Sequence, residues 1–302
     1  KKKKRQVGEK KRRKIMEEKT KPQARTRDLG KGSIPKLLAQ LAIPVVVAQI
    51  VNLLYNIVDR IYIGHIPGIG AAALTGVGLF APILMLINAF AMLSGSGGAP
   101  RAAIFMGKKD NETAEKIMAN CFSLILIFAI GLTILFSIFA PKLLILFGAS
   151  DATLPYAVEY ARIYIFGSIF VLIVLGMNLF ITTQGFSKIS MMTTLIGAVI
   201  NVILDPIFIF VFDMGVRGAA IATVLSQAVG AIWVLRFLTG EKTILKLKLS
   251  NMKLNPKVFG PCLALGISSF VMISTESLLS ISFTSSLARY GGDVAVGAMT
   301  II

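Results

Sequence analysis

Long apolar runs dominate the chain after residue 32. Residues 121–140 and 163–187 contain no charged side chain, and 40 uncharged residues separate Arg60 from Arg101. A helix rises 1.5 Å per residue, so about 20 apolar residues span a hydrocarbon core of roughly 30 Å. The pattern predicts an all-α, polytopic membrane protein. Its helices are expected near 37–63, 72–98, 117–140, 155–183, 189–212, 217–238 and 259–287, with an eighth beginning around 294.

The loops between these helices differ in charge and predict the orientation. Residues 1–31 hold 15 Lys and Arg against 4 Asp and Glu. If this tail is cytoplasmic, the basic loop residues concentrate on the inner side, as the positive-inside rule requires. We therefore expect a multi-pass protein of the cell membrane with a cytoplasmic N-terminus. The basic charge is expected to meet anionic membrane lipid and no nucleic acid.

One long connector interrupts the pattern of helices. Residues 239–257 read TGEKTILKLKLSNMKLNPK, in which Leu alternates with Lys. Such an amphipathic basic segment favours a helix or strand lying on the inner leaflet, with a partner-binding site as the alternative. The connector divides a six-helix unit from the residues that follow.

The composition argues against an enzyme. Cys121, Cys262 and the single histidine, His65, show no metal-ligand spacing, so neither a transition metal nor another bound cofactor is expected. No grouping predicts a nucleophile with its base. The segment GSGGAP (95–100) is not a phosphate loop, because no strand precedes it and no Lys-Ser/Thr follows. Its small residues favour close helix packing instead.

Three acidic residues fall inside predicted helices, namely Asp59, Asp205 and Glu276. A charge at the centre of a spanning helix costs about 2.5–3.5 kcal/mol on insertion scales, so each needs an explanation. Asp59 and Asp205 lie at similar depth, in the outer half of the bilayer. Alternatives remain open: Asp59 pairs with Arg60, Asp205 is structural, or Glu276 only makes a hydrogen bond between helices.

Other polar residues share faces with these acids. Asn201 lies one turn before Asp205, and Pro206 is expected to loosen that helix and free a carbonyl. Thr223 falls at a similar depth in the next helix. Together with Asp59 these side chains predict a site for a hard cation or a proton. Gln49, Asn52 and Asn56 lie on the Asp59 face and are candidates for a substrate cavity, although such side chains also simply join helices.

Several segments resemble the multidrug and toxin extrusion (MATE) family. They are YNIVDRIYIGH (55–65), GGAPRAAIFMGKKDNETAEK (97–116), ITTQGFSK (181–188), NVILDPIF (201–208) and GAAIAT (218–223). The resemblance covers roughly 33–302 and is closest to bacterial members of the DinF/NorM type. In one respect the chain departs from the family: it reads Gly266-Ile267-Ser268 where Gly-x-Pro is usual.

The resemblance implies a fold and a domain division. MATE proteins have twelve helices in two six-helix lobes. The expected parts are a basic tail (1–31, of which 1–15, before Met16, are expected to be extraneous), an N-terminal lobe (32–238), the connector (239–257) and the beginning of a C-terminal lobe (258–302). This implies a truncated chain that holds helix seven and the start of helix eight, whose native reading frame continues beyond Ile302.

The resemblance also implies a function. MATE proteins export amphipathic, often cationic drugs or toxic compounds across the cytoplasmic membrane in exchange for Na⁺ or H⁺. Asp59, Asn201, Asp205 and Thr223 match the cation site of the N-terminal lobe, and Glu276 matches an acid of helix seven, which makes it a possible second cation or substrate site. The alternatives are a lipid-linked precursor flippase of the same superfamily, or a non-transporting scaffold or receptor.

Overall fold

The computed structural model describes residues 33–301, so the basic tail and its possible start at Met16 lie outside the described residues. Seven helical stretches within this range are long and apolar enough to cross a membrane. They consist of α2 (Ile34–Gly64), α3 (Gly70–Leu79) with α4 (Ala81–Gly107), α5 (Asn111–Leu146), α6 (Leu154–Thr183), α7 (Ser187–Pro206) with the π-helical turn η1 (Ile207–Val211), α8 (Gly215–Thr239) and α9 (Pro256–Ile301). The all-α polytopic fold is therefore confirmed.

Several helices extend further than the apolar runs alone predict. The third spanning helix, expected at 117–140, runs through Pro141 and covers Asn111–Leu146. Its polar first turn is stabilised by Asp110, whose side chain accepts a hydrogen bond from the Thr113 amide at 3.1 Å. Such an N-terminal cap satisfies an amide that the helix leaves unpaired, and it lets a helix begin outside the apolar core.

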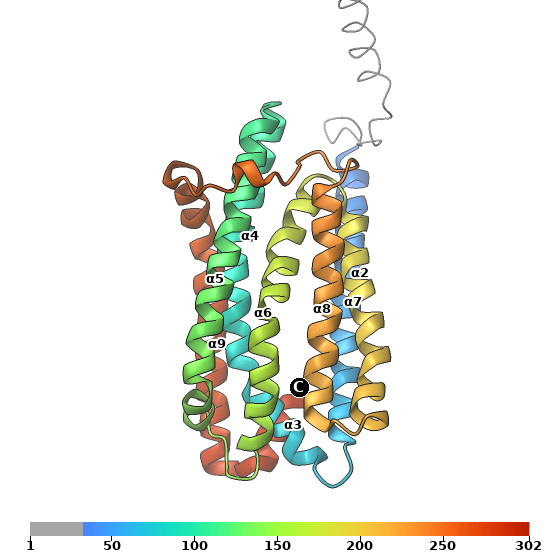
Figure 1. The fold of residues 1–302 in the computed structure, drawn as a ribbon, viewed down its shortest axis with the longest axis vertical. Helices are drawn as coiled ribbons and strands as arrows, with labels where there is room; N and C mark the ends of the chain where they lie inside the picture. The colour runs from blue at the N-terminus through green and yellow to red at the C-terminus, as the bar shows by residue number, and fades with distance from the viewer. Residues whose placement is uncertain (1–32, 302) are drawn as a thin grey trace, which may run out of the picture.

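The helices form one bundle whose centre is α6 (Figure 1). Helices α2 and α7 lie together at one side, α8 stands between them and α6, and α4, α5 and α9 make up the other side. The small residues of 95–100 pack α4 closely: Gly95, Gly97 and Gly98 are all buried. The expectation that this segment serves helix packing is confirmed.

The last described helix changes direction at Gly292. This residue has φ 65° and ψ −168°, a conformation that residues with a side chain rarely adopt. The kink separates a long helix from a short final segment that folds back toward α3 (Figure 1). It agrees with the prediction that an eighth helix begins around residue 294.

The connector between α8 and α9 is neither the helix nor the strand that its alternating pattern predicts. Apart from η2, a short 3₁₀ turn (Leu249–Asn251), it is irregular. The cause is a set of polar side chains at the adjacent ends of α5 and α6 that bind its backbone. The buried Gln184 Oε1 accepts hydrogen bonds from Thr243 Oγ1, Ile244 N and Leu245 N at 2.8–2.9 Å. These bonds replace the backbone pairing of a regular element.

Two further polar residues on α5 hold the remainder of the connector. Glu115 accepts from the Lys246 amide at 3.0 Å and from Lys248 Nζ at 2.5 Å. Asn120 accepts from the Asn255 amide at 2.8 Å. The connector is therefore attached to the N-terminal helices along most of its length.

Candidate cation site and adjoining cavities

Three of the predicted site residues meet where α7 packs against α8. Asn201 Nδ2 donates to Asp205 Oδ1 at 3.1 Å and to Thr223 Oγ1 at 3.3 Å. The Thr223 hydroxyl in turn donates to the Ala219 carbonyl of its own helix at 3.0 Å. Asp205 is 0 % exposed and Asn201 1 %. The amide therefore bridges two helices and fixes one carboxylate oxygen.

Asp59 approaches this group from α2. Its carboxyl group interacts electrostatically with that of Asp205, so the two acids predicted to share a depth also share a location. Three buried oxygens here accept no hydrogen bond, namely Asp59 Oδ1, Asn201 Oδ1 and Asp205 Oδ2. Buried polar atoms are normally paired, so these three mark a place suited to a cation or a proton.

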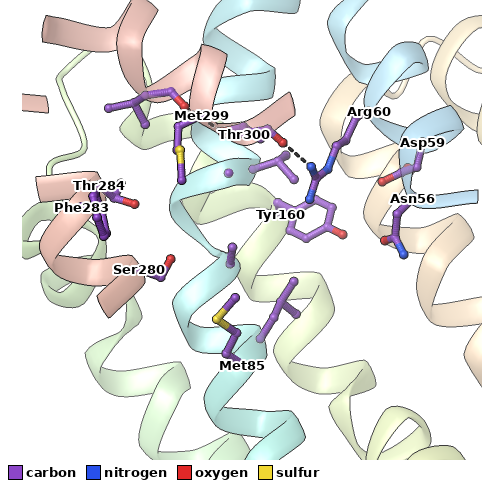
Figure 2. A pocket seen from close by; sticks show the side chains of 15 residues that line it. Asn56, Asp59, Arg60, Met85, Tyr160, Ser280, Phe283, Thr284, Met299 and Thr300 are labelled. Carbon is purple, nitrogen blue, oxygen red and sulfur yellow. Dashed lines mark hydrogen bonds between the residues drawn. The ribbon is translucent and has the colours of Figure 1, made fainter. Parts of the chain in front are cut away.

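The alternative pairing of Asp59 with Arg60 is absent from the ion pairs of the described residues. Arg60 instead donates through Nη1 to the backbone carbonyl of Thr300 on α9. Figure 2 shows the Arg60 side chain pointing toward Thr300 and away from Asp59. Asp59 thus makes no ion pair with Arg60, although the guanidinium charge still acts on its carboxyl group from a greater distance.

The helix that carries Asp205 loses its α-helical form directly afterwards. Pro206 ends α7, and the next five residues form the π-helical turn Ile207–Val211, with Phe212 N bonded to the Ile207 carbonyl at 2.9 Å. Single π turns in helices are frequently found at functional sites. The expected loosening at Pro206 is present.

A cavity of about 430 Å³ lies beside Asp59 (Figure 2). Its wall mixes polar and apolar side chains from α2, α3, α4, α6 and α9. The lining residues are Asn56, Asp59, Arg60, Val77, Gly78, Ala81, Leu84, Met85, Tyr160, Ser280, Phe283, Thr284, Val296, Met299 and Thr300. We call it the outer cavity, after the orientation that the loop charges predict.

A second cavity of about 210 Å³, the inner cavity, lies about one helical turn closer to the N-terminal end of α2. Asn52 and Asn56 line it together with Asn88, Tyr164 and Gln227 among others. Asn56 contributes to both cavities. Two of the three amide residues predicted for a substrate cavity therefore do line one.

Gln49 and Glu276 are not brought into these sites. Gln49 is exposed and lines neither cavity. It precedes Asp59 by ten residues, and because each residue turns the helix by about 100°, the two side chains point in directions roughly 80° apart. Glu276 is exposed on α9, whereas its neighbour Ser277 is buried and donates to the Pro82 carbonyl at 2.9 Å. The structure places Glu276 apart from the two paired acids.

Aromatic residues at the site were not predicted from the sequence. Tyr160 and Tyr164 of α6 stack with ring centroids 5.8 Å apart, and both interact electrostatically with Asp59. Tyr55 of α2 also interacts with both acids. The only available signal was the spacing of four between the two α6 tyrosines, which places them on one helix face.

Comparison with known proteins agrees with the fold and the motifs. The family model MatE matches residues 44–207. The chain is 26 % identical over 263 residues to the multidrug export protein MepA of Staphylococcus saprophyticus, and 24 % identical over 259 residues to that of Staphylococcus haemolyticus. In both cases the match covers 86 % of this chain and 57 % of the relative, so the chain spans just over half the length of these proteins.

Solved structures resemble the chain over most of its length. The MATE multidrug transporter DinF-BH, solved in complex with a ligand, matches with a TM-score of 0.86 and 35 % identity, covering 93 % of this chain and 62 % of that protein. An outward-facing MATE family transporter of the MOP superfamily matches with a TM-score of 0.80 and 27 % identity, covering 91 % of this chain and 61 % of that one. The family model matches more than half of the chain, and the chain belongs to the MATE family.

Proposed function

We propose that this chain forms the ion-binding part of a cation-coupled antiporter that exports amphipathic, often cationic compounds in exchange for Na⁺ or H⁺. The observation that carries the proposal is the set of three unpartnered buried oxygens on Asp59, Asn201 and Asp205. The names of the matching relatives, multidrug export proteins and a multidrug transporter, support export as the activity.

The chemistry of the site suits either coupling ion. Two carboxyl groups that interact in a low-dielectric bundle do not both ionise cheaply without a positive charge between them. A proton shared by Asp59 and Asp205 would remove that repulsion. Na⁺ would do so as well, because it is a hard cation that prefers the carboxylate, amide and hydroxyl oxygens gathered here.

Ion binding would draw α2 and α7 together. Asp59 also lines the outer cavity, so its position affects the shape of that cavity. The π-helical turn after Pro206 gives α7 a place to bend. In this mechanism, the ion and the exported compound each bind more tightly to a different arrangement of α2. Because each ligand shifts α2 toward the arrangement that it prefers, transport of the ion is coupled to transport of the compound.

The outer cavity suits an amphipathic compound. Apolar surface comes from side chains such as Met85, Phe283 and Met299, and the lining also carries one negative charge, on Asp59, and one positive charge, on Arg60. Pockets of this kind bind small molecules through apolar area and orient them through a few polar groups. The same acidic residue would then serve both ion and substrate, which makes their binding mutually exclusive.

Substitution of the acids tests this function in the native protein. Asp205→Asn keeps the side-chain shape but removes the charge, so ion-driven efflux of a fluorescent cationic dye should fall to background while membrane expression persists. Asp59→Asn should do the same. Asp151→Asn, which alters an exposed acid of the α5–α6 loop, is the matched control and should retain wild-type efflux. Wild-type efflux by both Asp59→Asn and Asp205→Asn would show that the acids are structural.

A cytoplasmic N-terminus and connector belong to the same proposal, since the Lys-rich connector lies on the expected inner side. Single cysteines at His65, Lys108 and Lys242, all exposed, test it once Cys121 and Cys262 are replaced by Ser. In intact cells, an impermeant thiol reagent should label only the His65 position. Labelling at the Lys242 position would show that the chain has the opposite orientation in the membrane.

A further inference from the structure

The only two cysteines of the chain lie together in the bundle, although they are 141 positions apart in the sequence. Cys121 is on α5, and Cys262 is on α9, beyond the connector. Both are free and 0 % exposed. Neither thiol takes part in the cation site or lines the cavities described above.

Their proximity follows from a close approach of three helices. Gly97 and Gly98 are consecutive residues of α4. A Cβ atom at Gly98 would lie 2.4 Å from Cys121 Sγ, and one at Gly97 would lie 1.9 Å from the Cys262 carbonyl oxygen. Because only glycine fits at both positions, α5 and α9 press against the same turn of α4. The two thiols then lie close enough to interact with each other, and Cys262 Sγ also donates to the Val258 carbonyl of its own helix at 3.3 Å.

A cationic group adjoins the pair. Arg101 of α4 interacts electrostatically with both thiols, and its Nε atom is buried without a hydrogen-bond partner. A guanidinium beside a thiol stabilises the thiolate, which is the nucleophilic form of cysteine. The arrangement therefore combines two adjacent thiols with a positive charge that favours the thiolate, while the burial of both sulfurs opposes it.

We propose that Cys121 and Cys262 form a redox-active dithiol site that reacts with membrane-permeant two-electron oxidants and closes to a disulfide joining α5 to α9. With a diazenedicarboxamide such as diamide, one thiolate adds to the N=N bond. The second thiolate then attacks the bonded sulfur, the S–N bond breaks, and a hydrazine leaves with the two thiol protons. The dithiol is oxidised and the diazene is reduced.

The proposal fits both the cellular compartment that the two thiols are expected to face and the burial of their sulfur atoms. In the orientation proposed above, the two thiols lie toward the cytoplasm, where thiols stay reduced at rest and disulfides are typically transient or redox-sensing. Since neither sulfur is exposed, the oxidant must wait for α9 to separate briefly from α4. The disulfide would bridge the connector and limit movement of α9 relative to the preceding helices. This inference does not depend on the transported compound or on the coupling ion.

Cross-linking of the native protein in membrane vesicles tests the proposal. After diamide treatment and quenching of free thiols, cleavage at a protease site inserted between Lys253 and Leu254, where the connector is exposed, separates the part before it from the part after it. The two fragments should stay joined on a non-reducing gel and separate on reduction. Cys121→Ser and Cys262→Ser should each abolish the joined species, and Arg101→Gln should slow its formation about tenfold if the guanidinium supplies the thiolate.

Two results would overturn the site. One is the absence of joined fragments in the folded protein when the same protein, unfolded in detergent and denaturant, does cross-link with diamide. The other is a disulfide-linked dimer in place of joined fragments, because it would show that the cysteines meet in different molecules.

Discussion

The two acids of the cation site are held in different ways. Asp205 is fully buried, and an amide that also reaches Thr223 on the next helix fixes one of its oxygens. Asp59 is half-buried and lines the outer cavity, on a helix whose polar side chains make few bonds to its neighbours. Asn56, for example, donates to the Asn52 carbonyl of its own helix, at 2.6 Å. The difference indicates a fixed acid on α7 and a movable acid on α2.

Lengthening each acid by one methylene should reveal the largest difference between Asp205 and Asp59. Asp205→Glu has no free space and should lower ion-driven efflux more than about tenfold, because overpacking a buried site costs about 1–3 kcal/mol. Asp59→Glu can extend into the outer cavity and should keep efflux within about threefold of wild type. Initial rates of dye efflux measure both. Equal losses would show that both acids are held with the same rigidity.

A smaller effect is expected from removing the amide that fixes Asp205. Asn201→Ala leaves buried groups unpaired, which costs about 1–3 kcal/mol and corresponds to a loss of about tenfold in ion affinity. Thr182→Ala, which removes a hydroxyl bonded to its own helix, is the matched control. Ion binding can be followed by the intrinsic fluorescence of purified protein. Unchanged affinity in Asn201→Ala would mean that Asp205 needs no support.

The smallest effect concerns Thr223, at the far end of the same chain of bonds. Thr223→Val keeps the volume but removes the oxygen that accepts from Asn201, and should cost about 1 kcal/mol. Thr223→Ser keeps the hydroxyl and should restore most of the loss. The shift in thermal unfolding midpoint on adding the coupling ion reports the difference. If Thr223→Val and Thr223→Ser show the same shift, the hydroxyl plays no part in the site.

Much of the fold and the core of the site were predictable from the sequence. Apolar length determines where a chain crosses the membrane, so the positions of the spanning helices followed directly. The convergence of Asp59 and Asp205 followed from their common depth, since two polar residues buried at one level lower their cost by meeting. The loosening at Pro206 followed from the chemistry of proline.

The sequence was less informative where the rotation of a helix or a tertiary contact decides the outcome. Gln49 and Asp59 belong to one series of residues spaced by three or four. Over ten residues this spacing does not match the helical repeat, so Gln49 points away from the cavities that Asp59 and the two asparagines line. Glu276 sits next to Ser277, and only packing determines which of the two faces α4. The connector has an amphipathic pattern, yet its backbone donors bind Gln184 and Glu115, which are distant in sequence.

The three donors on Gln184 have a practical consequence for anyone modifying this protein. A segment without regular secondary structure ordinarily exchanges its amide hydrogens fast, but the amides of Ile244 and Leu245 are bonded to a buried oxygen and should exchange as slowly as those of a helix. Because the connector is irregular, its whole length looks suitable for inserting an epitope or a fluorescent protein. Only part of the connector is suitable. Insertions between Lys253 and Leu254, where the chain is exposed, should be tolerated, whereas insertions between Thr243 and Lys248 should reduce expression.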